Sequence, residues 1–282
     1  TYSNAKEVIA MYRLLYKSLL YVLKEHANNI YRIITIVKYE IMAEHRDSKL
    51  GIVWSVLNPL IQIFSFWFAF GLGIRGGQPV DGIPYINWML AGIVPWFFIS
   101  DAIRSGTNSI HRRINIISKI KFPLSILPTV EVLKGLFVHL ITLGLGMIFL
   151  FMNGNSVHLM NLGVLYYLVC AILFVIAFGM ISSVLNMFTR DVRKGINASM
   201  RLLTYVTPIL WTMDKLPVSL QKLMCLNPLY YLIQGYRGSL LASSNMLPSF
   251  SDGIVFWFII ISMFLIGSIL MYKFKNKLIH FI

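Results

Sequence analysis

Apolar residues lie in long runs along this chain, and polar residues mark the breaks between the runs. A run of about 20 apolar residues is long enough to cross the hydrocarbon core of a bilayer as a helix. We predict six spans, at residues 52–74, 88–103, 124–152, 159–188, 198–213 and 254–272. The fifth is short and contains Pro208. The pattern therefore predicts an all-α membrane protein with a transmembrane domain over residues 51–282.

The segment before the first span is amphipathic. Between Asn29 and Lys49, apolar residues recur at helical spacing, namely Ile30, Ile33, Ile34, Val37 and Ile41. Charged residues occupy other faces, and residues 8–26 have a similar character. This pattern is typical of a helix in the headgroup layer. We therefore predict that residues 1–50 form a cytoplasmic segment with an interface helix, which anchors the chain to lipid or also meets a cytoplasmic partner.

Residues 216–241 fit neither a loop nor a span. The segment is too apolar for a solvated loop, and Pro217, Pro228, Gly235 and Arg237 interrupt it. Irregular backbone is tolerated at membrane depth only where protein covers it. We predict a re-entrant helical hairpin that enters the outer leaflet and returns.

Composition and charge agree with a membrane protein. Hydrophobic residues make up 57% of the chain and charged residues 13%, whereas soluble domains carry about 25% charged residues. The net charge of +14 suggests a nucleic-acid partner. However, 20 of the 25 Lys and Arg residues fall in four segments on one predicted side, and four fall on the other. The positive-inside rule then places both termini in the cytoplasm of a multi-pass plasma-membrane protein, and no nucleic acid is expected.

The first span carries a polar face. Trp54, Asn58, Gln62, Ser65 and Ala69 follow at spacings of four, four, three and four, which places them on one side of a helix. Side-chain amides are costly in hydrocarbon. The face therefore borders either neighbouring helices, to which it hydrogen-bonds, or a watery passage.

Other polar groups carry weaker signals. Glu131 and Lys134, three residues apart in the third span, can pair on one helix face. Buried ionisable residues in lipid also raise a functional hypothesis, so a self-satisfied pair and a functional pair both stay open. Cys170, Cys225 and the six histidines lack metal-ligand spacing, and no Gly-rich phosphate loop occurs. We expect no metal site, no disulfide framework and no cofactor on this chain.

Four stretches form a set: HRDSKLGIVWSVLNPL (45–60), YINWMLAGIVPWFFISDAIRSGTNSI (85–110), KIKFPLSILP (119–128) and NPLYYLIQGYR (227–237). Together they resemble the membrane subunit of ABC-2-type exporters of cell-surface polysaccharides. The resemblance extends over residues 31–277. Within that family the chain is similar to the wall teichoic acid export permeases, and the O-antigen and capsule permeases are the alternative.

The resemblance implies six spans, an interface helix and a re-entrant outer hairpin. It also implies a homodimer bound to two copies of a separate ABC ATPase, which carries ATP and Mg²⁺, and a substrate linked to undecaprenyl diphosphate. The chain would then be no enzyme by itself. A coupling segment that docks on the ATPase would lie within residues 112–123, with candidate residues Arg112, Arg113, Ile116, Ile117, Lys119 and Lys121.

Transport of a polysaccharide favours aromatic faces that stack on sugar rings and let a polymer slide. With the polar face of the first span, the candidates for this path are Trp54, Asn58, Gln62, Trp67, Trp96, Phe97, Tyr205 and Trp211. An interfacial aromatic belt is the alternative explanation for each aromatic residue.

Two other functions compete with polysaccharide export. A drug or lipid exporter of the same superfamily would lack the stretch around Trp54 to Pro59 and the hairpin motif. A membrane-embedded transferase acting on lipid-linked sugars would need clustered acidic residues, whereas Asp81, Asp214 and Asp252 on the outer side are widely spread.

Overall fold

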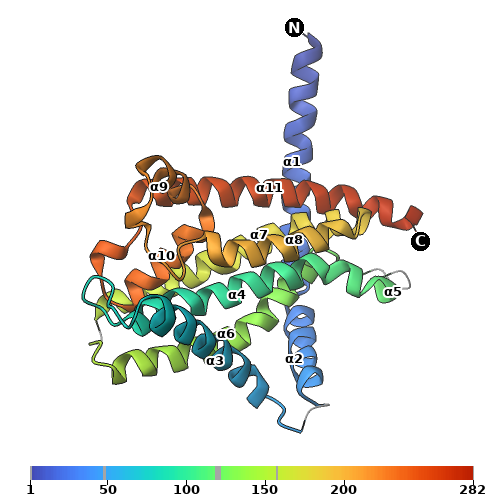
Figure 1. Cartoon of the computed structure of the whole chain (residues 1–282). Helices are drawn as coiled ribbons and strands as arrows, with labels where there is room; N and C mark the ends of the chain where they lie inside the picture. Colours follow the sequence, from blue (N-terminus) through green and yellow to red (C-terminus); the bar gives the residue numbers. More distant parts are fainter. Residues whose placement is uncertain (1, 47–48, 118–121, 157, 282) are drawn as a thin grey trace.

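The computed structural model describes residues 2–46, 49–117, 122–156 and 158–281, which form helices joined by short turns (Figure 1). The longer helices are α1 (Tyr2–Asn28), α2 (Ile30–Arg46), α3 (Val53–Phe66), α4 (Tyr85–Arg112), α6 (Ile126–Met152), α7 (Gly163–Phe188), α8 (Asp191–Val206), α10 (Pro228–Leu240) and α11 (Phe250–Phe281). The shorter elements are η1 (Trp67–Ile74), α5 (Ile114–Ile117), η2 (Leu159–Leu162), η3 (Met213–Lys215), α9 (Val218–Cys225) and η4 (Ser244–Met246). The one β pairing among the described residues is a bridge between Val80 and Ile83. The all-α prediction is confirmed.

Five helical segments of the described residues are long and apolar enough to cross a membrane. They are Val53–Ile74, Tyr85–Arg112, Ile126–Met152, Leu159–Phe188 and Phe250–Lys275. These ranges match the first four predicted spans and the last one. The first span joins α3 to the π-helical η1.

The predicted fifth span, residues 198–213, is not a continuous helix. α8 has 16 residues and ends at Val206, and Thr207 is extended with a ψ of 138°. The pyrrolidine ring of Pro208 disfavours the helical conformation at the preceding residue, which explains the break. α8 also begins at Asp191, so most of the predicted cytoplasmic link at 190–201 is helical instead.

α4 lies at the centre of the bundle, between α6 and α7 (Figure 1). It is longer than predicted, because residues 104–112 continue the helix and do not form a loop. Gly106 lets α4 approach α7 closely: a Cβ there would lie 3.6 Å from the Cα of Gly179. The Thr107 hydroxyl also donates to the Ser182 oxygen of α7 at 2.9 Å.

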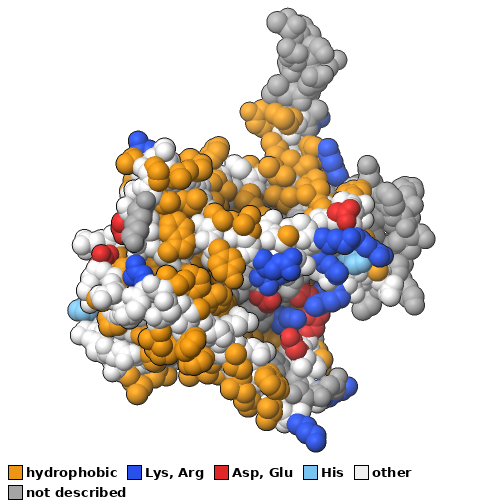
Figure 2. Space-filling view, in the orientation of Figure 1, with side chains coloured by type: hydrophobic (Ala, Val, Ile, Leu, Met, Phe, Trp, Pro, Cys, Tyr) orange, Lys and Arg blue, Asp and Glu red, His pale blue; other side chains and the backbone are white. Residues whose placement is uncertain are grey.

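α1 and α2 run across the direction of the long spans (Figure 1). α2 is the predicted amphipathic helix, and Ile33 packs against Ile126 and Val130 of α6. α1 crosses α11 and is held at the start of α6, where Glu25 accepts from the Ser125 backbone amide at 3.1 Å. Burial and the neighbouring Glu25 carboxylate raise the pKa of Tyr21. Two crosswise helices thus meet the charged end of the bundle (Figure 2).

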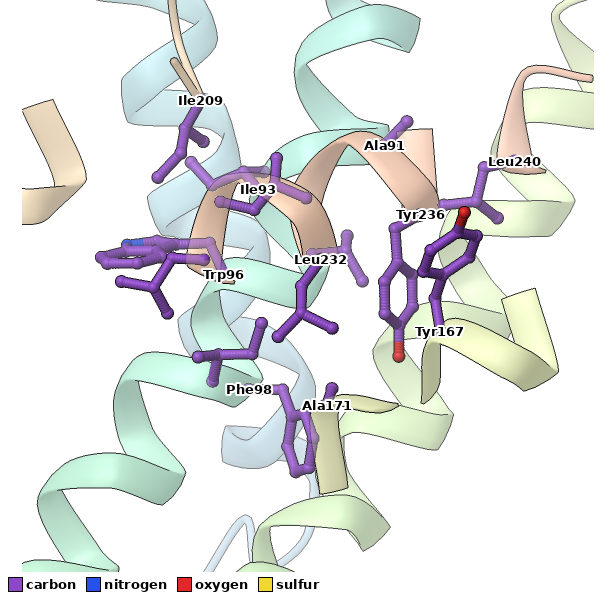
Figure 3. Close-up of a cluster of buried hydrophobic side chains, with 14 of the residues drawn as sticks. Ala91, Ile93, Trp96, Phe98, Tyr167, Ala171, Ile209, Leu232, Tyr236 and Leu240 are labelled. Carbon is purple, nitrogen blue, oxygen red and sulfur yellow. The ribbon is translucent and has the colours of Figure 1, made fainter. Parts of the chain in front are cut away.

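The predicted hairpin consists of α9, which is largely exposed, and α10, which is buried. Asn227 caps α10 by accepting from the Leu229 amide at 3.0 Å, and Pro228 occupies the first helical turn. Leu232 and Tyr236 of α10 point into an apolar cluster that includes Ile93 of α4 and Tyr167 of α7 (Figure 3). α10 is therefore packed against both α4 and α7, and α9 is not.

Candidate functional site

A cavity of about 670 Å³ lies between α3, α4 and α6, with the end of α2 and Thr204 of α8 at its edges. α3 contributes polar and apolar side chains in equal number, and α4 contributes aromatic and charged ones. The polar side chains from α6 include Lys134, His139 and Thr142. Such a mixed lining of aromatic, amide and charged groups suits a hydrophilic ligand with apolar ring faces.

The α3 wall of the cavity is the polar face that the sequence predicts. Trp54, Asn58 and Gln62 line the cavity, whereas Phe64 and Phe68 are 59% and 60% exposed on other sides of the helix. Neither Asn58 nor Gln62 forms a side-chain hydrogen bond among the described residues. The two amides therefore face open space beside α3 and do not tie it to a neighbouring helix.

The opposite wall comes from α4. Phe97 is half-buried in the lining, and Trp96 is only 1% exposed. The Trp96 indole N–H donates to the Thr204 hydroxyl at 3.1 Å. This hydrogen bond fixes the ring against α8, so Trp96 forms the floor of the cavity.

Three of the predicted path residues lie away from this cavity. Trp67 packs close to Gly71, where an added Cβ would lie 3.0 Å from its ring. Tyr205 is 58% exposed, and its carbonyl accepts from the Trp211 indole at 2.8 Å. The structure thus brings together Trp54, Asn58, Gln62, Trp96 and Phe97, and leaves the other three elsewhere.

The predicted pair of Glu131 and Lys134 exists, with 3.7 Å between its charged atoms. It belongs to a larger network. Glu131 is fully buried and also pairs with Arg112 and, at 2.8 Å, with Arg113. Glu40 pairs with both arginines, and Glu44 lies 3.4 Å from Lys134. Sequence spacing missed this network because its members come from α2, α4 and α6.

The network changes the interpretation of the coupling segment. Arg113 is buried in these ion pairs, and Ile117 is buried beside Val22 and Leu127. Both side chains are therefore buried within the single chain, and their role in docking on an ATPase stays a prediction. Arg112 stays 46% exposed. The side chain of Ile116, and Lys119 and Lys121, lie outside the described residues.

The sequence identifies Arg237 only as an interruption of the hairpin and does not predict its structural role. In α10 this side chain is 1% exposed. Its guanidinium donates to the carbonyls of Trp88, Pro208 and Ile209 and stacks 3.7 Å from the Trp88 ring. Gly92 makes room, because a Cβ there would lie 2.3 Å from the Arg237 Nη2. An arginine in an apolar segment indicates a buried polar contact, but the sequence does not show which carbonyls accept its hydrogen bonds.

No group of three His, Cys, Asp or Glu side chains is placed to hold a metal among the residues described. Cys170 is buried and Cys225 half-buried, both as free thiols. His139 stacks on Phe98 with ring centroids 4.6 Å apart and shares a hydrogen bond with the Tyr236 hydroxyl at 3.2 Å. Its contacts are those of a packed side chain at the edge of the cavity.

Comparison with known proteins places this geometry in context. The sequence profile of the ABC-2 type transporter family matches residues 31–241. Two O-antigen export system permease proteins RfbA from Klebsiella pneumoniae are 28% and 27% identical over 206 residues, which cover 73% of this chain and 78% of each relative. A protein of the same name from Myxococcus xanthus is 26% identical over 209 residues, with the same coverage.

These relatives bear on the predicted substrate. All three are named as O-antigen export permeases, which favours the O-antigen alternative over wall teichoic acid. The matched region begins at residue 31 and ends at residue 241, so α1 and α11 lie outside it.

Proposed function

The chain belongs to the ABC-2 type transporter family, a family of transmembrane transporter subunits, and on that premise we propose that it is the permease of an O-antigen-type polysaccharide exporter. Such a permease passes a lipid-linked polymer from the cytoplasm to the outside. We assign ATP hydrolysis to an ABC ATPase partner, as the family implies, and this sequence contains no Gly-rich phosphate loop.

The observation that carries this proposal is the cavity beside α3. It places the amides of Asn58 and Gln62, which have no hydrogen-bond partner among the described residues, beside the aromatic rings of Trp54 and Phe97. Amides exchange hydrogen bonds with sugar hydroxyls, and aromatic faces cover the apolar faces of sugar rings. A lining of this kind holds a carbohydrate weakly enough for the polymer to move on.

We propose that two copies of the chain assemble and that the face of Trp54, Asn58 and Gln62 borders the polymer path. The α3–η1 span supports this arrangement, because 6% of its most apolar stretch is buried by the rest of the subunit. A second copy, packed so that a polymer passage runs between the two, would cover part of that exposed surface.

The ATPase contact is proposed at the cytoplasmic end of α4 and at α5. The ion pairs of Arg112 and Arg113 with Glu131 fix this end to α6, so a push on α5 would reach the wall of the cavity. Asn115 on α5 is exposed, and we propose that it lies at the contact with the ATPase.

Reconstitution with the ABC ATPase tests the function. The complex in proteoliposomes is supplied with an undecaprenyl-diphosphate-linked O-antigen chain, and ATP hydrolysis and polymer translocation are followed together. We expect this substrate to stimulate hydrolysis and to be exported. Stimulation by lipid-linked teichoic acid but not by O-antigen would support the alternative substrate, and stimulation by neither would overturn polysaccharide export.

A further inference from the structure

An apolar groove of about 380 Å³ runs between α2 and α6. Ile34, Val37, Ile41 and Met42 of α2 form one side, and Leu133 and Phe137 of α6 form the other. Lys38 is the one charged residue among these lining side chains. Because α2 lies across the spans, the groove opens where an interfacial helix meets a membrane-spanning helix (Figure 1).

This groove is continuous with the polar cavity described above. Ile41 and Phe137 line both hollows, so they form the boundary between them. An apolar chain in the groove would therefore end beside the polar side chains of the cavity. Amphiphilic ligands are the class of molecule that a joined apolar and polar site accommodates.

The cavity offers cationic groups close to that boundary. Lys134 lies one helical turn before Phe137 and lines the cavity. Arg104 lines it as well, and its buried Nε has no hydrogen-bond partner among the described residues. A buried donor without a partner is costly, and a phosphate oxygen would satisfy it with a charge-assisted hydrogen bond.

The same cavity offers groups suited to a sugar. Asp101 lines the α4 wall beside Arg104, and Phe97 and Trp54 present rings from facing helices. A carboxylate accepts hydrogen bonds from sugar hydroxyls. The acidic residue also balances the cations, so the cavity favours a head that combines phosphate with sugar over a bare anion.

We propose that the groove and the cavity form one binding site for an inner-leaflet lipid whose phosphate-containing head carries a sugar. The lipid chain occupies the groove between α2 and α6. Its phosphate lies near Lys134 and Arg104, and the first sugar lies between Trp54 and Phe97. This site rests on the proposed function, because it would receive the lipid-linked substrate before export begins.

Site-directed photo-crosslinking of the full chain in bilayer nanodiscs tests the site. A benzophenone amino acid replaces Met42, which lines the groove, or Tyr39, an exposed residue of α2 that does not line it and serves as the control. Met42 is 57% exposed and Tyr39 is 65% exposed. The probe is undecaprenyl diphosphate carrying one radiolabelled N-acetylglucosamine, with unlabelled probe and phosphatidylglycerol as competitors.

We expect labelling from position 42 that unlabelled probe removes and phosphatidylglycerol does not, with little labelling from position 39. Equal labelling from both positions, or equal competition by phosphatidylglycerol, would overturn the proposal, because the groove would then hold any lipid. Polymer export is measured separately in cells. If the chain supports export but position 42 is not labelled in nanodiscs, the lipid site is wrong and the proposed function stands. If position 42 is labelled but no polymer is exported, the lipid site stands and the proposed function is wrong.

The polar half of the site has its own test in the same assay. Arg104→Gln removes the charge that faces the phosphate and should weaken probe binding about tenfold, which corresponds to about 1.4 kcal/mol. Arg104→Lys keeps the charge and should recover much of the loss, which separates phosphate binding from a folding defect. Unchanged binding of the Arg104→Gln protein, checked for a monodisperse profile, would contradict the site.

Discussion

The spans formed by α4 and by α3–η1 are both apolar enough to cross a membrane, yet they differ in how far the rest of the chain buries them. Of the most apolar stretch of each span, 83% is buried in α4 and 6% in α3–η1. α4 is packed between α6 and α7, whereas α3 stands at the edge of the bundle (Figure 1). Hydropathy finds spans, and it does not tell a central helix from an outlying one.

Side-chain size and polarity explain the difference. α4 has Gly92 and Gly106 where Arg237 and α7 approach it. α3 and η1 instead leave the large side chains of Phe64 and Phe68 exposed, with no described helix of the same chain packed over them. The outlying helix is then free to present Asn58 and Gln62 to a hollow. α4 is thus a buried structural helix, and the polymer path beside α3 is the role that the proposed function gives to the exposed one.

The largest expected effect lies in the ion-pair network that joins the C-terminal end of α4 to Glu131 of α6. Glu131→Ala removes the buried carboxylate that pairs with Arg112 and Arg113. Breaking a buried ion pair by removing one partner costs about 3–5 kcal/mol, so thermal unfolding in detergent should show a large loss of stability.

Asp191→Ala is the control for that change, since Asp191 and Lys194 form a surface pair with side chains 80% and 78% exposed. Surface pairs contribute little, so the control should unfold as the unmodified chain does. Similar losses in the two variants would contradict the role given to the buried network.

A second comparison uses one glycine in each span. Gly92→Ala places a Cβ 2.3 Å from the Arg237 guanidinium in α4, whereas Gly73→Ala in η1 meets its nearest atom at 3.6 Å. Overpacking costs about 1–3 kcal/mol. We expect a lower unfolding temperature for Gly92→Ala only. If the two variants unfold alike, α4 is less tightly packed than described.

A smaller effect should follow loss of the hydrogen bond between Trp96 and Thr204. Thr204→Val leaves the buried indole N–H of Trp96 without an acceptor, which costs about 1–3 kcal/mol. Thr204→Ser keeps the hydroxyl and is the control. Thermal unfolding should place Thr204→Ser between the valine variant and the unmodified chain, and indistinguishable variants would show that the hydrogen bond adds nothing.

The smallest effect on stability is expected in α3. Asn58→Leu removes an amide that has no hydrogen-bond partner among the described residues, so stability should change by no more than about 0.5 kcal/mol. Polymer export should nevertheless fall. Loss of stability and export in proportion would mean that Asn58 serves helix packing.

Sequence patterns predicted much of this fold and only part of the candidate site. Periodicity was sufficient for α2, for the polar face of α3 and for the five long spans, because these depend on local spacing. It failed at α8, where Pro208 ends the helix before a span is complete. It also missed two partners of Glu131, since Arg112 and Arg113 reach it only through tertiary packing.

The most direct test of the account is water access along α3 in the assembled transporter. Cys170→Ala and Cys225→Ser remove the native thiols, and single cysteines then replace Asn58 or Leu60. Leu60 is 47% exposed and lies on the far side of the helix. The account predicts that a membrane-impermeant maleimide labels Asn58→Cys but not Leu60→Cys, and that bound lipid-linked polymer protects Asn58→Cys. An unreactive Asn58→Cys would contradict a polymer path beside this face.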